Sequence, residues 1–350
     1  MVTVTDRSVE FSVDDPEGTL RGVRLYQELF RPRIGPRFDR RGDRWRLSFP
    51  RPPADRMEYL LVVTRSDGTR AWVVDGTNPL RVEGVFGPKS VVELPGYAPP
   101  AWLDAPTPTS RRLPFDLRLG ATPLPVVLWA PGGTDPEAVL PLLLVHDGPE
   151  YDTFARLLSF LAWGIARGDI PPLRAALLPP PAGRRDETYS ANADYVRRFG
   201  ELLQTLRWLA PHPADAAVAM GASLGALALL HVHWRLPHTF AGLFLQSGSF
   251  FRPRTDPQEQ TFAYFDRVAA FVGEVLNTPR SPRTIPIRLT CGSVEENLAN
   301  NRQVAAALDD LGHPVSLVTN RDGHSYTAWR DTFAPHLATF LAAVLGRVHA

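Results

Sequence analysis

Apolar and polar residues alternate along the first hundred positions of the chain, in short runs separated by turn-forming residues. A period of two places one set of side chains in a core and the other in solvent, which is typical of β-strands. Short strands with Asp, Gly and Pro between them favour a β-sandwich. The predicted strands cover residues 9–13, 23–26, 45–49, 58–63 and 71–74.

Three aromatic residues lie within these predicted strands: Trp45, Tyr59 and Trp72. Large rings at strand spacing most often fill a core, and we expect that place for all three. A surface platform that stacks sugar rings is the alternative, and the sequence leaves it open.

A proline-rich stretch over residues 94–108 marks a boundary in the chain. Proline lacks an N–H group and restricts the backbone, so regular structure is not expected there. We therefore predict an N-terminal β-sandwich domain over residues 1–103, a linker over 104–112 and a second domain over 113–350.

The second domain shows a different pattern. Short, continuously apolar runs alternate with helical periodicity, which predicts an α/β domain with a mainly parallel sheet. The predicted strands are 115–119, 126–130, 140–146, 174–178, 216–222, 242–246, 285–291 and 315–319. The predicted helices are 154–166, one ending near 209, one after Ser223, 262–276, 300–311 and 329–344, with a long polar loop over 179–192.

A Gly-x-Ser-x-Gly motif joins one of these strands to the helix that follows it. Gly221, Ser223 and Gly225 occupy its fixed positions. Glycines on both sides leave room for a tight turn that lifts a serine hydroxyl clear of a sheet, as a hydrolase nucleophile requires. A plain Gly-Ser turn is the alternative, because the motif also occurs by chance.

A serine nucleophile needs a base, and the base needs an acid that orients it. In the α/β-hydrolase order both follow the serine, each just after a later strand. His324 follows the last predicted strand and is the candidate base, while Glu295 follows the strand before it and is the candidate acid. Glu296 and Asp322 remain alternatives for the acid.

Two backbone donors should stabilise the tetrahedral intermediate. We expect one to be the amide of Leu224 and the other to come from the loop after His146. We expect His231 and His233, on the helix after Ser223, to be packing or surface residues. Neither these two nor His238 shows metal-ligand spacing with another His, Cys or carboxylate. We accordingly expect no metal site and no cofactor.

Net charge and cysteine content indicate which partners and which cellular compartment to expect. The formal net charge is +1, which implies neither nucleic acid nor an anionic membrane surface as a partner. Cys291 is the single cysteine, so no disulfide forms within the chain, which fits a reducing compartment. With no basic and apolar leader in the first residues and no apolar run of about 20 residues, we expect a cytoplasmic protein.

In these motifs the second domain resembles the esterase D-type α/β hydrolases, and more closely their enterochelin (ferric enterobactin) esterase branch. The pattern Gly-x-x-acid at Gly292 to Glu295 is similar to the family's turn and favours Glu295 over Glu296. The other segments that carry the likeness are 144–148, 185–192, 221–225, 245–249 and 322–330. The N-terminal half more loosely resembles the family's early-set, immunoglobulin-like domain at residues 75–79 and 94–97.

One position departs from the family pattern. Relatives take the second oxyanion donor from the residue after Asp-Gly, which here is Pro149 and has no N–H. Either the donor shifts to Glu150 or Tyr151, or the oxyanion hole is weaker, and the sequence leaves this assignment open.

The resemblance implies a serine esterase that cleaves a small-molecule ester, a ferric tri-catecholate siderophore, and so releases iron that belongs to the substrate. Arg184, Arg185 and Arg252 would then pair with an anionic ligand beside Tyr151, unless they are merely solvated surface charges. Two rival hypotheses remain: a carbohydrate esterase that removes acetyl or feruloyl groups, and a non-catalytic ligand- or glycan-binding protein, which Pro149 alone favours.

Overall fold

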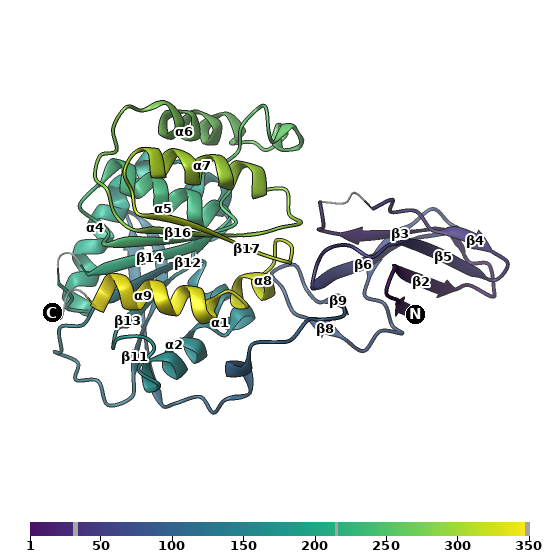
Figure 1. Ribbon diagram of the computed structural model, residues 1–350, viewed down its shortest axis with the longest axis horizontal. Coiled ribbons are helices and arrows are strands. Elements are labelled where there is room, and N and C mark those ends of the chain that lie inside the picture. The colour runs from purple at the N-terminus through teal and green to yellow at the C-terminus, as the bar shows by residue number, and fades with distance from the viewer. Residues whose placement is uncertain (31–33, 214–215, 347–350) are drawn as a thin grey trace. The chain divides into compact units, whose positions relative to one another are not determined.

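The computed structural model describes residues 1–30, 34–213 and 216–346, and these form two compact units (Figure 1). One unit contains Met1–Pro99 together with two short segments from much later in the chain, Gly292–Glu296 and Asn320–Ala328. The other unit contains Pro100–Cys291, Asn297–Thr319 and Trp329–Ala350. Two turns near the end of the chain thus group with the N-terminal residues.

The N-terminal residues form a sandwich of two antiparallel sheets, which confirms the all-β prediction. The first sheet has the order β1-β2-β5-β4, with β1 Val2–Val4, β2 Ser8–Asp14, β5 Arg44–Pro50 and β4 Asp39–Arg41. The second has the order β3-β6-β9-β8, with β7 also paired to β6; these strands are β3 Leu20–Gln27, β6 Arg56–Arg65, β9 Lys89–Glu93, β8 Arg81–Val82 and β7 Arg70–Val73.

The core of this sandwich draws on both sheets, and it tests the aromatic prediction. Trp45 and Tyr59 are buried in it, as predicted. The prediction for Trp72 is wrong, because its side chain is 58% exposed and meets the ring of Tyr26 edge-on at 4.9 Å. Val73 lies opposite the buried Leu61, so alternation along β7 turns the neighbouring Trp72 outward.

The second unit is built on an eight-stranded sheet with the order β10-β11-β13-β12-β14-β15-β16-β17. Strands β12 to β16 run parallel to one another, while β10 and β11 form an antiparallel edge in which β11 pairs with β13, as the sequence predicts. The bounds are β10 Ser110–Leu119, β11 Thr122–Pro131, β12 Leu142–His146, β13 Arg174–Leu178, β14 Ala217–Ala222, β15 Gly242–Gln246, β16 Ile287–Gly292 and β17 Val315–Asn320.

Helices cover both faces of this sheet, α4 to α7 on one face and α1, α2 and α9 on the other (Figure 1). Their bounds are α1 Gly148–Ala155, α2 Leu157–Ala166, α3 Arg185–Tyr189, α4 Ala193–Leu209, α5 Leu224–Arg235, α6 Phe265–Asn277, α7 Leu298–Asp310, α8 Tyr326–Arg330 and α9 Ala338–Leu345. Short 3₁₀ turns cover Ala101–Asp104 and Pro257–Glu259. None of the helices in the described ranges is long and apolar enough to cross a membrane.

Three helical predictions need correction. The predicted polar loop over 179–192 contains helix α3, and helix α1 lies where no helix was predicted. The predicted helix over 329–344 is broken into α8, a π-helical turn at Phe333–Leu337, and α9. The break falls at Pro335, which lacks the N–H group of a continuous helix, and the backbone of Ala334 leaves helical angles just before it.

Candidate active site

Ser223 occupies a strained turn between strand β14 and helix α5. Its backbone has φ 55° and ψ −125°, a conformation that non-glycine residues seldom adopt. The flanking glycines allow close packing, because a β-carbon on Gly225 would lie 3.2 Å from Asp147 Oδ2 and one on Gly221 would lie 3.0 Å from the backbone of Gly225. This is the strand-turn-helix geometry that the Gly-x-Ser-x-Gly motif predicts.

The N-terminus of helix α5 begins directly after this serine. Leu224 is its first residue, so its amide is one of the N–H groups that have no partner within the helix. The helix dipole adds partial positive charge at the same place, which favours an oxyanion. Leu224 therefore has the position of the predicted first donor.

The loop after His146 carries the predicted second donor. Asp147 has φ 50° and starts helix α1, in which Pro149 occupies a first-turn position. Tyr151 uses its amide within the helix, donating to the Asp147 carbonyl at 3.0 Å. The Tyr151 amide is thus already used within helix α1. The amide of Glu150 remains the candidate for the second oxyanion donor.

The Glu150 side chain has an unusual environment. Its Oε2 atom is buried and has no hydrogen-bond partner. Burial and the nearby charge of Asp147 raise the pKa of the Glu150 carboxyl, although its own amide and Arg185 act in the opposite direction. Burial of this oxygen thus disfavours the charged form of the Glu150 carboxyl.

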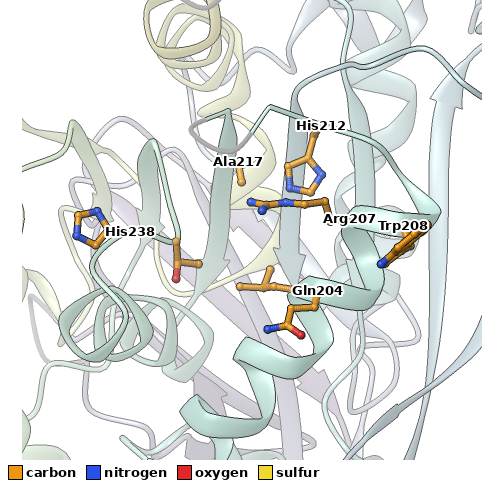
Figure 2. Close-up of a pocket in the computed structure, with 8 residues that line it drawn as sticks. Gln204, Arg207, Trp208, His212, Ala217 and His238 are labelled. Carbon is orange, nitrogen blue, oxygen red and sulfur yellow. The ribbon is translucent and has the colours of Figure 1, made fainter.

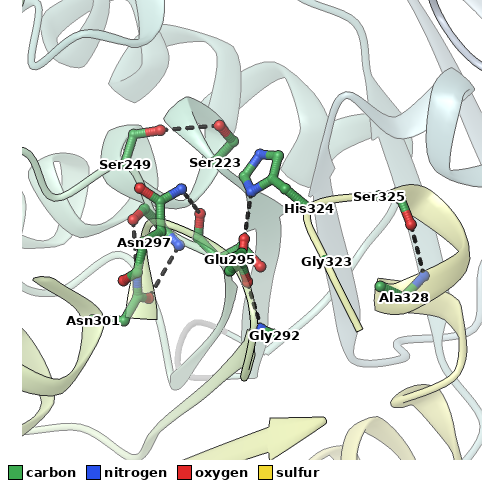
Figure 3. Close-up of polar contacts among 12 residues, drawn as sticks. Ser223, Ser249, Gly292, Glu295, Asn297, Asn301, Gly323, His324, Ser325 and Ala328 are labelled. Atoms are coloured by element: carbon green, nitrogen blue, oxygen red, sulfur yellow. Dashed lines mark hydrogen bonds and ion pairs between the residues drawn. The ribbon is translucent and has the colours of Figure 1, made fainter. Parts of the chain in front are cut away.

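The candidate acid and base contact each other (Figure 3). His324 Nδ1 and Glu295 Oε2 are 2.6 Å apart, and the amide of Gly292 donates to the other oxygen of Glu295. Glu295 is buried, whereas the His324 side chain is 29% exposed. With Nδ1–H donating to the carboxylate, Nε2 is the nitrogen that can accept a proton.

Electrostatics favour the charged form of this imidazole. Burial lowers the pKa of His324, but the hydrogen bond and charge of Glu295, with smaller effects of Glu28 and Glu296, outweigh it and raise the pKa above the ordinary value. A paired carboxylate that stabilises an imidazolium is what a proton-accepting histidine needs during catalysis.

The alternative acids have other positions. Asp322 Oδ1 accepts from the Gly323 amide at 2.7 Å, and its Oδ2 lies 3.9 Å from Arg56 Nη1. Glu296 contributes charge to His324, but the hydrogen bond at Nδ1 is made by Glu295.

A second serine adjoins the candidate nucleophile. Ser249 Oγ lies 2.9 Å from Ser223 Oγ, and the Ser249 amide donates to the Ser223 carbonyl at 3.1 Å (Figure 3). The sequence predicts no role for Ser249. The signal available was its place just after strand β15, which pairs in parallel with β14 and so ends beside Ser223.

The four predicted substrate contacts have different environments, and the first of them, Arg184, donates to both carboxylate oxygens of Glu187 at 3.0 and 2.8 Å. Tyr151 is fully buried, and its hydroxyl donates to Gln246 Oε1 at 2.8 Å, so its prediction as a ligand contact is not supported. Arg185 donates hydrogen bonds to both carboxylate oxygens of Asp147, at 2.9 and 2.7 Å. Arg252 is partly exposed, and its amide donates to Asp256 Oδ2 at 2.8 Å. Of the three arginines, Arg184 and Arg185 are thus each paired with a carboxylate.

His146 contacts the nucleophile turn through a hydrogen bond to the backbone of Gly225. Its Nδ1 is 3.1 Å from the Gly225 carbonyl and its Nε2 is 2.6 Å from the Tyr195 hydroxyl. Burial lowers the pKa of His146 to about 4, so the ring is neutral near pH 7. His231 and His233 are also buried, in agreement with a packing role. Across the described ranges, no group of three or more His, Cys, Asp and Glu side chains is arranged to hold a metal ion.

A pocket of about 510 Å³ lies at the other end of strand β14 (Figure 2). Ala217, the first residue of β14, lines it together with Arg207, Trp208, His212 and His238. Ligands of parallel α/β sheets bind beyond the carboxyl ends of the strands, and this pocket is at an amino end. None of the predicted site residues lines it.

Comparison with known proteins shows which solved structures share this fold. No protein-family model and no curated protein matches the sequence. Among solved structures, ferric enterobactin esterase from Salmonella typhimurium aligns with a TM-score of 0.77 and 19% identity, covering 99% of this chain and 97% of that one. The enterobactin esterase from Shigella flexneri, solved in the presence of enterobactin, aligns with a TM-score of 0.74 and 20% identity, covering 99% and 96%.

A ferulic acid esterase also matches, with a TM-score of 0.53 and 15% identity, but it covers only 67% of this chain and 98% of its own. The resemblance inferred from motifs is thus confirmed at the level of fold. Over nearly its whole length, this chain has the fold of the enterobactin esterases, an α/β-hydrolase domain preceded by an all-β domain.

Proposed function

We propose that this protein is a serine esterase in which Ser223, His324 and Glu295 form the catalytic triad. The observation that carries the proposal is the hydrogen bond of 2.6 Å between His324 Nδ1 and Glu295 Oε2. The strained backbone of Ser223 supports it independently. Along the chain Ser223 follows strand β14, Glu295 follows β16 and His324 follows β17, which is the order of serine, acid and base in α/β hydrolases.

The reaction would proceed through an acyl-enzyme. His324 Nε2 takes the proton of Ser223 Oγ as this oxygen attacks the ester carbonyl carbon, and Glu295 stabilises the imidazolium. The amides of Leu224 and Glu150 bind the oxyanion. Collapse breaks the ester bond, and the alcohol leaves with the proton from His324. Water then attacks the acyl group, gives a proton to His324, and releases the acid as Ser223 regains its proton.

The substrate class proposed is a siderophore of the tri-catecholate type, carrying ferric iron as cargo. Support comes from the enterobactin esterase structures, which align with nearly all of this chain, including its all-β part. Arg252, partly exposed in the segment after strand β15, is the cation that we propose pairs with such an anionic ligand. Feruloyl esterases align with about two thirds of the chain, which makes a carbohydrate ester the second candidate.

The first experiment asks whether Ser223 drives ester hydrolysis. Wild type should hydrolyse p-nitrophenyl acetate, and Ser223→Ala should lower kcat by at least about 10³-fold, because only the triad supplies the nucleophile. Ser110→Ala, at an exposed serine that starts strand β10, is the matched control and should retain wild-type activity. Turnover at the uncatalysed rate in both proteins would refute the proposal and leave a non-catalytic binding protein, and equal turnover above that rate would refute Ser223 as the nucleophile.

The second experiment identifies the substrate. Ferric enterobactin, salmochelin and acetylated or feruloylated xylan are each incubated with wild type and Ser223→Ala, and the products are analysed by mass spectrometry. We expect serine-dependent cleavage of the siderophores. Cleavage of xylan alone would favour the carbohydrate esterase instead.

A further inference from the structure

The loop that carries His324 is held by the start of strand β6 in the N-terminal sandwich. Three residues near this strand start contact three residues of the loop, in the same order along both segments. The pairs are Asp55 with Arg321, Arg56 with Asp322, and Glu58 with Ser325. All six belong to one compact unit of the structure.

The first pair joins both backbone and side chains. The amide of Asp55 donates to the Arg321 carbonyl at 2.5 Å, and Arg321 Nε donates to Asp55 Oδ1 at 2.9 Å. Because Arg321 is the first residue after strand β17, this pair fixes where the loop leaves the strand.

The second pair is electrostatic. Arg56 is buried, and its Nη1 lies 3.7 Å from Glu58 Oε1 and 3.9 Å from Asp322 Oδ2. Its guanidinium stands 5.5 Å from the centre of the Tyr97 ring, and neither Nε nor Nη1 has a hydrogen-bond partner. Arg56 thus acts through its charge, which stabilises two largely buried carboxylates: Asp322 on the loop and Glu58 on the sandwich, the latter also 3.7 Å from Lys89 Nζ.

The third pair reaches the residue next to the base. The Ser325 hydroxyl acts on the Glu58 carboxyl and lowers its pKa, against the larger effect of burial, and the Ser325 oxygen accepts from the Ala328 amide at 3.2 Å (Figure 3). Ser325 therefore links strand β6 to the first turn of helix α8. His324 lies between the second and third contacts, so its backbone is fixed on both sides.

The acid turn is held by the same sandwich. The amide of Phe30 donates to the Val294 carbonyl at 2.7 Å, and the Val294 side chain is buried in the sandwich core. Val294 directly precedes Glu295. The sandwich therefore contacts both partners of the acid–base pair through their neighbours in the chain.

We propose that the N-terminal sandwich positions the acid–base pair, with Arg56 and Glu58 of strand β6 as positioning residues for His324. Strand β17 is the last strand of its sheet and has a neighbour on one side only, so the loop after it needs support from another element. The sandwich gives that support at three points. The consequence for turnover rests on the proposed function, whereas the anchoring itself does not.

A spectroscopic test does not require turnover. A histidine N–H in a short bond to a carboxylate gives a proton resonance at very low field, which His324→Gln would assign by removing it. We expect this resonance in wild type, and we expect Ser325→Ala and Arg56→Met to broaden or abolish it. Arg56→Lys should retain it, because Arg56 acts through its charge. Arg65→Met, at an exposed arginine on the far end of β6, should leave it unchanged.

Kinetics on the same full-length variants supply the second readout. A base displaced by a fraction of an ångström should lower kcat by about 10- to 100-fold while KM stays within about twofold. If Ser325→Ala and Arg56→Met fold and keep both the resonance and kcat, the positioning role is refuted while the esterase proposal stands. If wild type shows no Ser223-dependent turnover, the esterase proposal fails and the resonance alone decides the anchoring. If Arg56→Met does not fold, Ser325→Ala decides.

Discussion

The bond between Glu295 and His324 makes a prediction about pH. Only neutral His324 can accept a proton, and its pKa is raised, so kcat/KM should rise with pH and reach half its maximum above pH 6.5. In Glu295→Gln the charge is lost while burial remains, and burial lowers the pKa. The acid limb of the pH profile should therefore move to lower pH, and the maximum should fall by about 10²- to 10⁴-fold.

Glu296→Gln is the matched control for this change. It removes a neighbouring charge but not the hydrogen bond, so its acid limb should shift slightly in the same direction and its maximum should stay within about threefold of wild type. pH–rate profiles of the three proteins provide the measurement. An acid limb in Glu295→Gln that stays in place would show that another group sets the pH dependence.

At the residue scale, the sequence predicted what depends on local pattern. Ser223 in its tight turn follows from the glycine spacing, and the pairing of Glu295 with His324 agrees with the order of strands. Ser249 was missed because its contact with Ser223 arises from two strands brought together by the sheet. Tyr151 was assigned a ligand role because no local pattern shows that helix α1 turns its ring into the core.

At the element scale, a pair of glycines tests how closely the elements pack. A β-carbon on Gly292, the last residue of strand β16, would lie 2.1 Å from the Asp322 carbonyl oxygen, which is backbone and cannot yield. Gly292→Ala should therefore lower the melting temperature and displace the Glu295 turn, with a loss of esterase activity of tenfold or more, in the range of about 10²-fold for a 1 Å shift.

Gly273→Ala is the matched substitution within helix α6. Nothing lies within 4 Å of its added β-carbon, and alanine favours a helix interior by about 1 kcal/mol over glycine, so stability should rise. Differential scanning calorimetry compares both variants with wild type. A stable and active Gly292→Ala would show that the two turns are not packed as the structure has them.

The same scale explains which elements the sequence could predict. Strands β12 to β16 were predicted because a strand buried on both faces is apolar throughout, and this leaves a clear local signal. Helix α3 was missed because it has five residues, too few for helical periodicity to emerge among polar neighbours. The break in the last helix was missed although Pro335 signals it, since the apolar pattern continues on both sides.

For the whole molecule, one compact unit combines segments that are far apart in the sequence. Segments Gly292–Glu296 and Asn320–Ala328 carry Glu295 and His324, yet they pack with residues 1–99. Periodicity is a local property and cannot report contacts between residues 266 positions apart, such as that between Asp55 and Arg321. The role of the sandwich therefore follows from the structure, while its existence follows from the sequence.

Stability toward acid is the prediction that belongs to the whole molecule. Burial lowers the pKa of His146, His231 and His233 to about 4 each, whereas an unfolded histidine titrates near 6.5. The unfolded chain thus binds protons first as pH falls, so their contribution is complete above pH 6.5 and is lost between about 6.5 and 4. His324, whose pKa is raised, contributes in the opposite sense, and we expect His146, His231 and His233 to dominate.

His231→Leu isolates one of these contributions. The His231 ring packs edge-on against Phe271 at 4.7 Å, so an apolar side chain suits the site. Between pH 7 and pH 5 each of these histidines should lower the unfolding free energy of wild type by about 2 kcal/mol. The drop in unfolding free energy over this range should therefore be about 2 kcal/mol smaller in His231→Leu than in wild type. Urea denaturation at both pH values measures this, with exposed His238→Leu as the control. Equal losses in wild type and His231→Leu would mean that the unfolding transition does not sense this burial, and acid sensitivity would then have to arise from the carboxylates.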